Sequence, residues 1–149
     1  MTGLAREQVV GVFNEQGVSV GFETGQETAT TLLGVLEELR PLKAGVNFDP
    51  ANMILYGMGD PVKSLEVLLP LVVQVHIKDA LPAAKKGEWG REVVVGTGAV
   101  DWAEFLSVLT RFRKPINMVF EREAGDQRAQ DIAAGLRSLQ HVLPSGAGP

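Results

Sequence analysis

Apolar residues follow two alternating patterns along this chain. Short, nearly continuous apolar runs are typical of strands buried in a parallel sheet, and apolar residues spaced three or four apart are typical of amphipathic helices. The strand-like runs lie at 17–24, 44–50, 71–77 and 116–123. The helix-like segments lie at 4–15, 28–39, 63–72, 102–112 and 127–142. The pattern therefore predicts a leading helix and four strand–helix units.

Turn and capping residues mark the predicted boundaries. Gly17 and Pro41 follow the first two helices, where the chain must leave the helical conformation. Asp60, Asp101 and Asp126 each stand where a helix is predicted to begin, and aspartate is a favoured N-cap. The segment between Asp60 and the preceding strand contains glycines and is predicted to be a loop.

A longer connection covers residues 80–100, between the third strand and the next helix. Its Gly, Lys and Trp content favours a loop or a short hairpin lying over the end of the sheet. Within it, Gly96-Thr97-Gly98 is predicted to form a turn. Residues 1–143 are predicted to form one domain, and 144–149 a flexible C-terminal tail.

Two architectures accommodate repeating strand–helix units: an open parallel sheet and a closed (β/α)₈ barrel. Such a barrel usually needs about 250 residues. A chain of 149 residues with four strands supplies only half of one. The fold class expected is therefore α/β, as a partial (β/α)₈ TIM barrel of α(βα)₄ form, with the open sheet as the alternative.

Composition and charge limit which binding partners and which cellular compartment are expected for this chain. Apolar residues make up 45% and charged residues 21%, as in ordinary soluble globular proteins. The net charge is −4 and the charges are interspersed, which argues against a nucleic-acid partner. The chain has no cysteine, no apolar run long enough to span a membrane, and an N-terminus that begins as a helix. A cytoplasmic protein without a membrane partner is predicted.

Each predicted strand ends in a potential metal ligand: Glu23, Asp49, His76 and Glu121. Active sites of parallel α/β proteins lie at the carboxyl ends of the strands, so these side chains are expected to converge. Three carboxylates would repel one another unless a cation lay among them. Oxygen-rich coordination with one nitrogen suits Mn²⁺ or Mg²⁺ first, with Co²⁺ or Zn²⁺ possible.

A divalent cation beside carboxylates suits the removal of a proton next to a carbonyl group, through an enediolate. Returning the proton to the adjacent carbon is isomerisation, and returning it to the opposite face is epimerisation. Glu23 and Glu121 come from the first and last strands and are the predicted acid–base pair.

Five segments, GFETG, NFDPANM, VHIKDA, VGTGAVDW and VFEREAG, resemble the sugar-phosphate isomerase/epimerase group of xylose isomerase-like barrels. The resemblance covers about residues 4–142 and corresponds to strands five to eight of that barrel. It implies a metal set of Glu23, Asp49, His76 and Glu121. It also implies that the two glutamates both ligate the metal and transfer protons. Asn52 stands where some members carry a histidine.

Substrate contacts are predicted for Asn52, Lys78 and Arg122. Lys78 is alternatively part of a solvated strand end, and Arg122 alternates to the opposite face from its neighbours, which favours a structural role. Glu123 competes with Glu121, because the two side chains point to the same side.

Simpler roles remain open for the other three predicted ligands. His76 is alternatively a structural histidine, Asp49 a turn former and Glu23 a helix cap.

Two functions remain open. One is a divalent-metal-dependent isomerase or epimerase acting on a sugar or sugar phosphate, or the metal-bearing half of one. The other is a non-catalytic, truncated or split half-barrel that needs a complementary N-terminal half or a second copy of itself. Endonucleases that act on abasic DNA share this barrel, but two histidines and a net charge of −4 argue against that activity.

Overall fold

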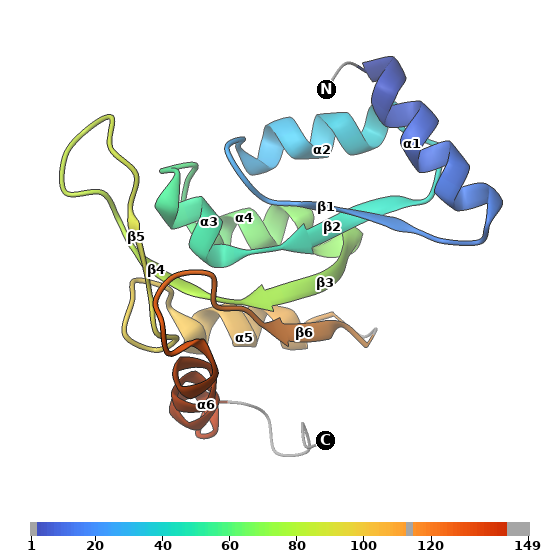
Figure 1. Ribbon diagram of the computed structural model, residues 1–149. Coiled ribbons are helices and arrows are strands. Elements are labelled where there is room, and N and C mark those ends of the chain that lie inside the picture. Colours follow the sequence, from blue (N-terminus) through green and yellow to red (C-terminus); the bar gives the residue numbers. More distant parts are fainter. Residues whose placement is uncertain (1–2, 113–114, 143–149) are drawn as a thin grey trace.

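The computed structural model describes residues 3–112 and 115–142 (Figure 1). The predicted boundary at residue 143 and the predicted tail, 144–149, lie outside the described residues. The helices are α1 (Gly3–Glu15), α2 (Ala29–Glu38), α3 (Pro50–Leu55), α4 (Pro61–Leu68), α5 (Trp102–Thr110) and α6 (Arg128–Leu139), with a 3₁₀ turn η1 (Leu69–Leu71). The strands are β1 (Val20–Glu23), β2 (Ala44–Phe48), β3 (Val72–Ile77), β4 (Asp79–Leu81), β5 (Arg91–Val93) and β6 (Asn117–Phe120).

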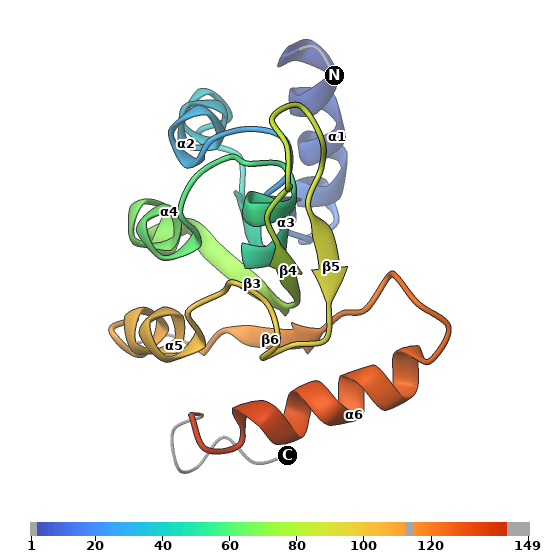
Figure 2. The same ribbon diagram turned by 90° about the vertical axis from the view of Figure 1, so that its left-hand side faces the viewer.

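Strands β1, β2, β3 and β6 form one sheet in that order, and every neighbouring pair is parallel. Viewed along the strands, the sheet follows an arc with α2, α4 and α5 on its outer side (Figure 2). Helices α1 and α6 flank the two ends of the arc. A doubly wound open sheet would carry helices on both faces, whereas one outer layer of helices is the arrangement of a barrel wall. The predicted α/β half-barrel is confirmed.

The hydrophobic core lies between the sheet and this outer layer of helices. Val75 and Ile77 of β3 are 0% and 1% exposed, and the rings of Phe48 and Phe105 lie 5.7 Å apart within the same core. Because successive side chains of a strand point to opposite faces, Gln74 and His76 lie on the inner face of the arc. Core packing on one face therefore directs the polar residues of β3 into the barrel interior.

The connection after β3 forms the predicted hairpin, in which β4 and β5 pair antiparallel. Asp79 fixes its base and is 1% exposed. Its carboxylate accepts hydrogen bonds from the backbone N–H groups of Gly96 (2.9 Å), Gly98 (3.0 Å) and Val100 (3.2 Å) and from Trp102 Nε1 (3.1 Å). The predicted Gly-Thr-Gly turn thus wraps a buried carboxylate. The hairpin lies at the end of the sheet to which the strand arrows point (Figure 1).

Two local predictions are wrong. The segment after Pro50, expected to be a loop, forms the short helix α3, because the Asp49 side chain accepts a hydrogen bond from the Asn52 N–H and caps it. Asp126 does not cap α6: Gln127 stands at the N-cap, and its side chain makes no capping bond. The predicted caps Asp60 and Asp101 are confirmed.

Helix α1 carries its apolar stripe on an exposed surface. Leu4, Val12 and Phe13 are 74%, 63% and 49% exposed, whereas Val10 is fully buried. A register shift between β2 and β3 leaves Val73 outside the alternation and turns its side chain toward Gly21 and Gly45 on the inner face. Val73 and Val119, on this inner face, are also more than 40% exposed. Residues 3–112 and 115–142 include no helix with the length and hydropathy that a bilayer span requires.

Candidate metal centre

The four predicted ligands meet at the carboxyl end of the sheet. Glu23 ends β1, Asp49 caps α3, His76 lies in β3 and Glu121 directly follows β6. One ligand atom from each lies within 4.8 Å of all the others. His76 Nδ1 lies 3.4 Å from Glu23 Oε1, 3.8 Å from Asp49 Oδ2 and 3.3 Å from Glu121 Oε2. The parallel sheet therefore brings the ends of its four strands to one point.

Two buried atoms at this point have no hydrogen-bond partner among the described residues: Asp49 Oδ2 and His76 Nδ1. Leaving buried polar atoms unsatisfied costs free energy, so such atoms call for an explanation. Both face the centre of the cluster, where three carboxylates and an imidazole could surround a cation. The donor set fits a hard divalent ion such as Mn²⁺ or Mg²⁺, and the orphaned atoms are the ones such an ion would bind.

Two side-chain amides on the inner face of the sheet, those of Asn47 and Gln74, support the His76 ring on the side away from the cluster. His76 Nε2 lies 3.1 Å from Asn47 Nδ2, and Gln74 Nε2 donates to Asn47 Oδ1 at 3.3 Å. A partner on the outer ring nitrogen fixes the orientation in which the other nitrogen faces the cluster. Asn47 was not among the predicted site residues.

Thr24 positions Asp49, and sequence reasoning missed it too. The Thr24 hydroxyl accepts a bond from the Asp49 N–H at 2.8 Å and donates to the Asp49 carbonyl at 2.9 Å. Asp49 Oδ1 accepts from the Asn52 N–H at 3.1 Å, which leaves Oδ2 for the cluster. Thr24 was detectable only as the residue directly after a predicted ligand.

Asn52 lies inside the site, where it contacts Glu23. Its Nδ2 donates to Glu23 Oε1 at 3.1 Å and to the Thr24 carbonyl at 3.0 Å. The side-chain donor is thus engaged in orienting Glu23, and the contact of Asn52 with a substrate stays a prediction.

Lys78 is buried, so the interpretation of a solvated strand end is wrong. Its side chain is 1% exposed, and Nζ donates to Glu121 Oε2 at 3.0 Å and to Glu123 Oε2, and lies 3.4 Å from Asp49 Oδ2. Burial alone would lower the pKa of Lys78, but Asp49, Glu123 and Glu121 together raise it, which keeps the ammonium charged. A substrate contact by Lys78 stays a prediction.

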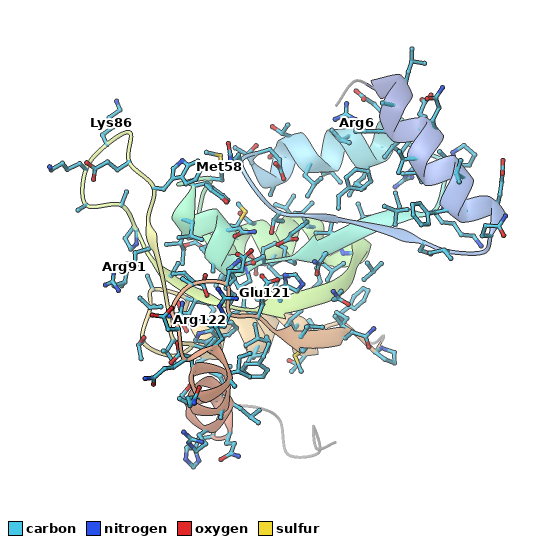
Figure 3. All side chains as sticks on the ribbon, viewed as in Figure 1. Arg6, Met58, Lys86, Arg91, Glu121 and Arg122 are labelled. Carbon is cyan, nitrogen blue, oxygen red and sulfur yellow. The ribbon has the colours of Figure 1, made fainter. Side chains whose placement is uncertain are left out.

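Arg122 points away from the cluster, as the alternation of side chains indicated. Its Nη1 donates to Glu92 Oε1 at 2.8 Å, and its Nε donates to Asp131 Oδ2 at 2.9 Å. Figure 3 places Arg122 toward the β4–β5 hairpin, beside Glu121. These ion pairs support the structural interpretation, and the predicted substrate contact remains a prediction.

A cavity of about 440 Å³ opens beside the cluster. Glu23, Asn52, Tyr56 and Glu123 are among the residues that line it. The cavity shares Glu23 with the four-residue cluster, so it gives open space next to the candidate metal centre.

Two groups of the cluster, His76 and Glu23, have raised pKa values. The Asp49 carboxylate raises the pKa of His76, burial acts in the opposite direction, and Glu121 and Glu23 add to the increase. Burial raises the pKa of Glu23, and His76 partly offsets this. Without a cation, Glu23 and His76 therefore retain their protons more strongly than the isolated groups would.

The metal-free chain should lose stability as the pH rises through the folded-state pKa of His76. That pKa lies above the unfolded value of 6.5, so the stabilisation from the protonated ring is complete below pH 6.5 and is lost above the raised pKa. Urea unfolding in the presence of a chelator, at about pH 6 and about pH 8.5, measures the difference. The variant His76→Gln should show a smaller difference, and an equal one would refute this origin of the pH dependence.

Comparisons with known proteins agree with this fold. A model of the xylose isomerase-like TIM barrel family matches residues 6–142. A xylose isomerase domain protein from Planctomyces limnophilus is 34% identical, with a TM-score of 0.86, over 94% of this chain and 52% of that chain. No match was found among curated proteins.

Two more distant structures share the fold alone. A xylose isomerase-like TIM barrel protein from Mycobacterium smegmatis, in complex with magnesium, is 14% identical with a TM-score of 0.72, over 91% of this chain and 47% of that one. D-allulose 3-epimerase from Methylomonas sp. is 19% identical with a TM-score of 0.66, over 95% of this chain and 48% of that one.

The chain thus spans about half the length of the solved proteins it resembles. The family model covers residues 6–142, and the relative from Planctomyces limnophilus is more than 30% identical over nearly all of this chain. These matches, together with the arc of four parallel strands, show that the chain belongs to the xylose isomerase-like TIM barrel family.

Proposed function

We propose that this chain is a divalent-metal-dependent isomerase or epimerase of a sugar or sugar phosphate, or the metal-bearing half of one. The observation that carries the proposal is the convergence of Glu23, Asp49, His76 and Glu121 on one point. Two buried atoms of this cluster, Asp49 Oδ2 and His76 Nδ1, have no hydrogen-bond partner among the described residues. One similar structure is a complex with magnesium and another is named D-allulose 3-epimerase, which supports the choice of metal and substrate class.

Each residue of the site then has a distinct task. Asp49 and His76 would hold the cation with the two glutamates, and the cation, when bound, would polarise a carbonyl and its neighbouring hydroxyl. Glu121 and Glu23 come from opposite edges of the sheet and would exchange a proton with the two sides of a substrate carbon. Lys78 holds Glu121 in place, and Asn52 holds Glu23.

Solvent exchange of the substrate's α-proton tests this function whatever the product is. The purified chain with Mn²⁺ should catalyse deuterium uptake from D₂O into one or more ketoses or ketose phosphates of a panel, read by NMR or mass spectrometry. A chelator should abolish the uptake. Absence of uptake across the panel, by a chain shown to bind Mn²⁺, would refute catalysis by this chain alone.

The second candidate is a non-catalytic half-barrel that requires a complementary N-terminal half or a second copy of itself. The exposed apolar stripe of α1 and the exposed Val73 and Val119 on the inner face favour it, because monomers rarely leave such surfaces uncovered. Both outer strands, β1 and β6, also have one unpaired edge within the described sheet. Light scattering tests this second candidate: a dimer, or a complex with a supplied half-barrel, supports association, and a well-behaved monomer counts against it.

A further inference from the structure

Glu92 is a buried carboxylate outside the predicted metal set. It belongs to β5, pairs across the hairpin with Ala80, and its side chain is 7% exposed. Its Oε1 accepts from Arg122 Nη1 at 2.8 Å and from the Glu123 N–H at 3.0 Å, and its Oε2 accepts from the Ala124 N–H at 3.0 Å. One side chain of the hairpin therefore satisfies three donors of the segment after β6.

This segment needs an anchor because it leaves the sheet. β6 ends at Phe120, and the bond from the Glu121 N–H to the Ile77 carbonyl, at 3.2 Å, lies just beyond the strand end. The backbone N–H groups of Glu123 and Ala124 donate to Glu92 instead. Arg122 extends the anchor to α6 through Asp131.

The alternation of side chains makes this anchor relevant to the metal centre. Arg122 faces Glu92, and its two neighbours, Glu121 and Glu123, face the opposite side and both accept hydrogen bonds from Lys78 Nζ. Fixing Arg122 and the following amides therefore fixes the direction in which Glu121 points. The β4–β5 hairpin is itself held in place, because the Asp79 carboxylate at the start of β4 accepts hydrogen bonds from residues of the 96–102 segment.

We propose that Glu92 is a positioning residue, which holds residues 121–124 so that Glu121 is presented to the metal cluster. The proposal rests on the proposed function for its metal. Partners that orient metal ligands typically change metal affinity by roughly 10–100-fold when they are removed. Glu92 would act through Glu121 and would contact neither metal nor substrate.

Calorimetric titration with Mn²⁺ tests the proposal on the full chain. Glu92→Gln keeps the side-chain shape and removes the charge, and should weaken Mn²⁺ binding by about tenfold or more. Glu88→Gln, an exposed position on the same hairpin, is the matched control and should leave the affinity unchanged. In a Glu121→Gln background, Glu92→Gln should weaken binding by less than about twofold, since the ligand through which it acts is already altered.

Equal weakening in both backgrounds would show a general structural effect and overturn the proposal, as would unchanged affinity in Glu92→Gln. A second readout needs no metal: amide hydrogen exchange at residues 123 and 124 of the metal-free chain. Exchange should be faster in Glu92→Gln and unchanged in Glu88→Gln. Unchanged exchange in Glu92→Gln would contradict the claim that Glu92 holds residues 123 and 124. Failure of the wild-type chain to bind Mn²⁺ would instead refute the proposed function. The hydrogen-exchange result would then still test whether Glu92 holds residues 123 and 124 in place.

Discussion

Replacing Asp79 by Ala is expected to lower the free energy of unfolding by about 4 kcal/mol, among the largest effects of a single substitution. The change removes the shared acceptor of the N–H groups of Gly96, Gly98 and Val100 and of Trp102, and leaves buried donors unsatisfied. The loop and the carboxylate fit each other closely, because a Cβ on Gly98 would lie 2.0 Å from Asp79 Oδ1. A side chain at position 98 would therefore force the loop and the carboxylate apart.

Urea unfolding followed by circular dichroism measures this loss. A stability decrease of this size corresponds to a fall of roughly 10 °C in melting temperature for a domain of this length. Asp79→Asn should also be strongly destabilised, because its amide group would face other donors. Asp126→Asn makes the same chemical change at an exposed position and should stay near wild type. An Asp79→Ala variant within about 1 kcal/mol of wild type would show that the network contributes little.

The second large effect is expected on catalysis. Glu121→Gln and Glu23→Gln should each slow metal-dependent deuterium uptake by roughly 10²–10⁴-fold, because glutamine cannot accept the substrate proton. Circular dichroism should show an intact fold for both variants. The rate is measured at saturating Mn²⁺, so that weaker metal binding is not mistaken for lost proton transfer.

Glu123→Gln is the control that separates Glu121 from its neighbour. Glu123 also binds Lys78, but its side chain is 67% exposed and it is outside the four-ligand cluster. Its replacement should reduce the rate by less than about tenfold, below what one proton-transfer group contributes. If Glu123→Gln loses as much activity as Glu121→Gln, the proton-transfer role of Glu121 is wrong.

The strand ends were predictable because their pattern is local. An apolar run specifies a parallel strand, and the residue at its carboxyl end lies at the edge where neighbouring strands also end. Glu23, Asp49 and His76 could therefore be chosen without knowledge of any contact, and the family resemblance favoured Glu121 over Glu123. The fold brings all four into one cluster. The same logic predicted the four-stranded parallel sheet.

The supporting residues could not be predicted in this way. Glu92 binds Arg122 across 30 positions, and Asp79 binds Trp102 across 23. Such partners depend on how a hairpin folds back, which no periodicity records. Lys78 followed a strand like any solvated lysine, and only the three carboxylates around it explain its burial.

For helix α1, the sequence predicts the helix but not the surface that covers it. Its apolar stripe was readable from the sequence, but the stripe alone does not tell what covers it. Val12 and Phe13 are exposed, and the similar solved proteins are about twice as long as this chain. The amphipathic pattern thus identified a helix and left its partner surface open.

The central claim, that four strand ends build a divalent-metal centre, is tested most directly by Mn²⁺ calorimetry on the purified chain beside its His76→Ala variant. Binding of about one ion per site with a dissociation constant on the order of micromolar, lost in His76→Ala, is the predicted result. A folded chain that binds no Mn²⁺, or binds it equally well without His76, would contradict the claim.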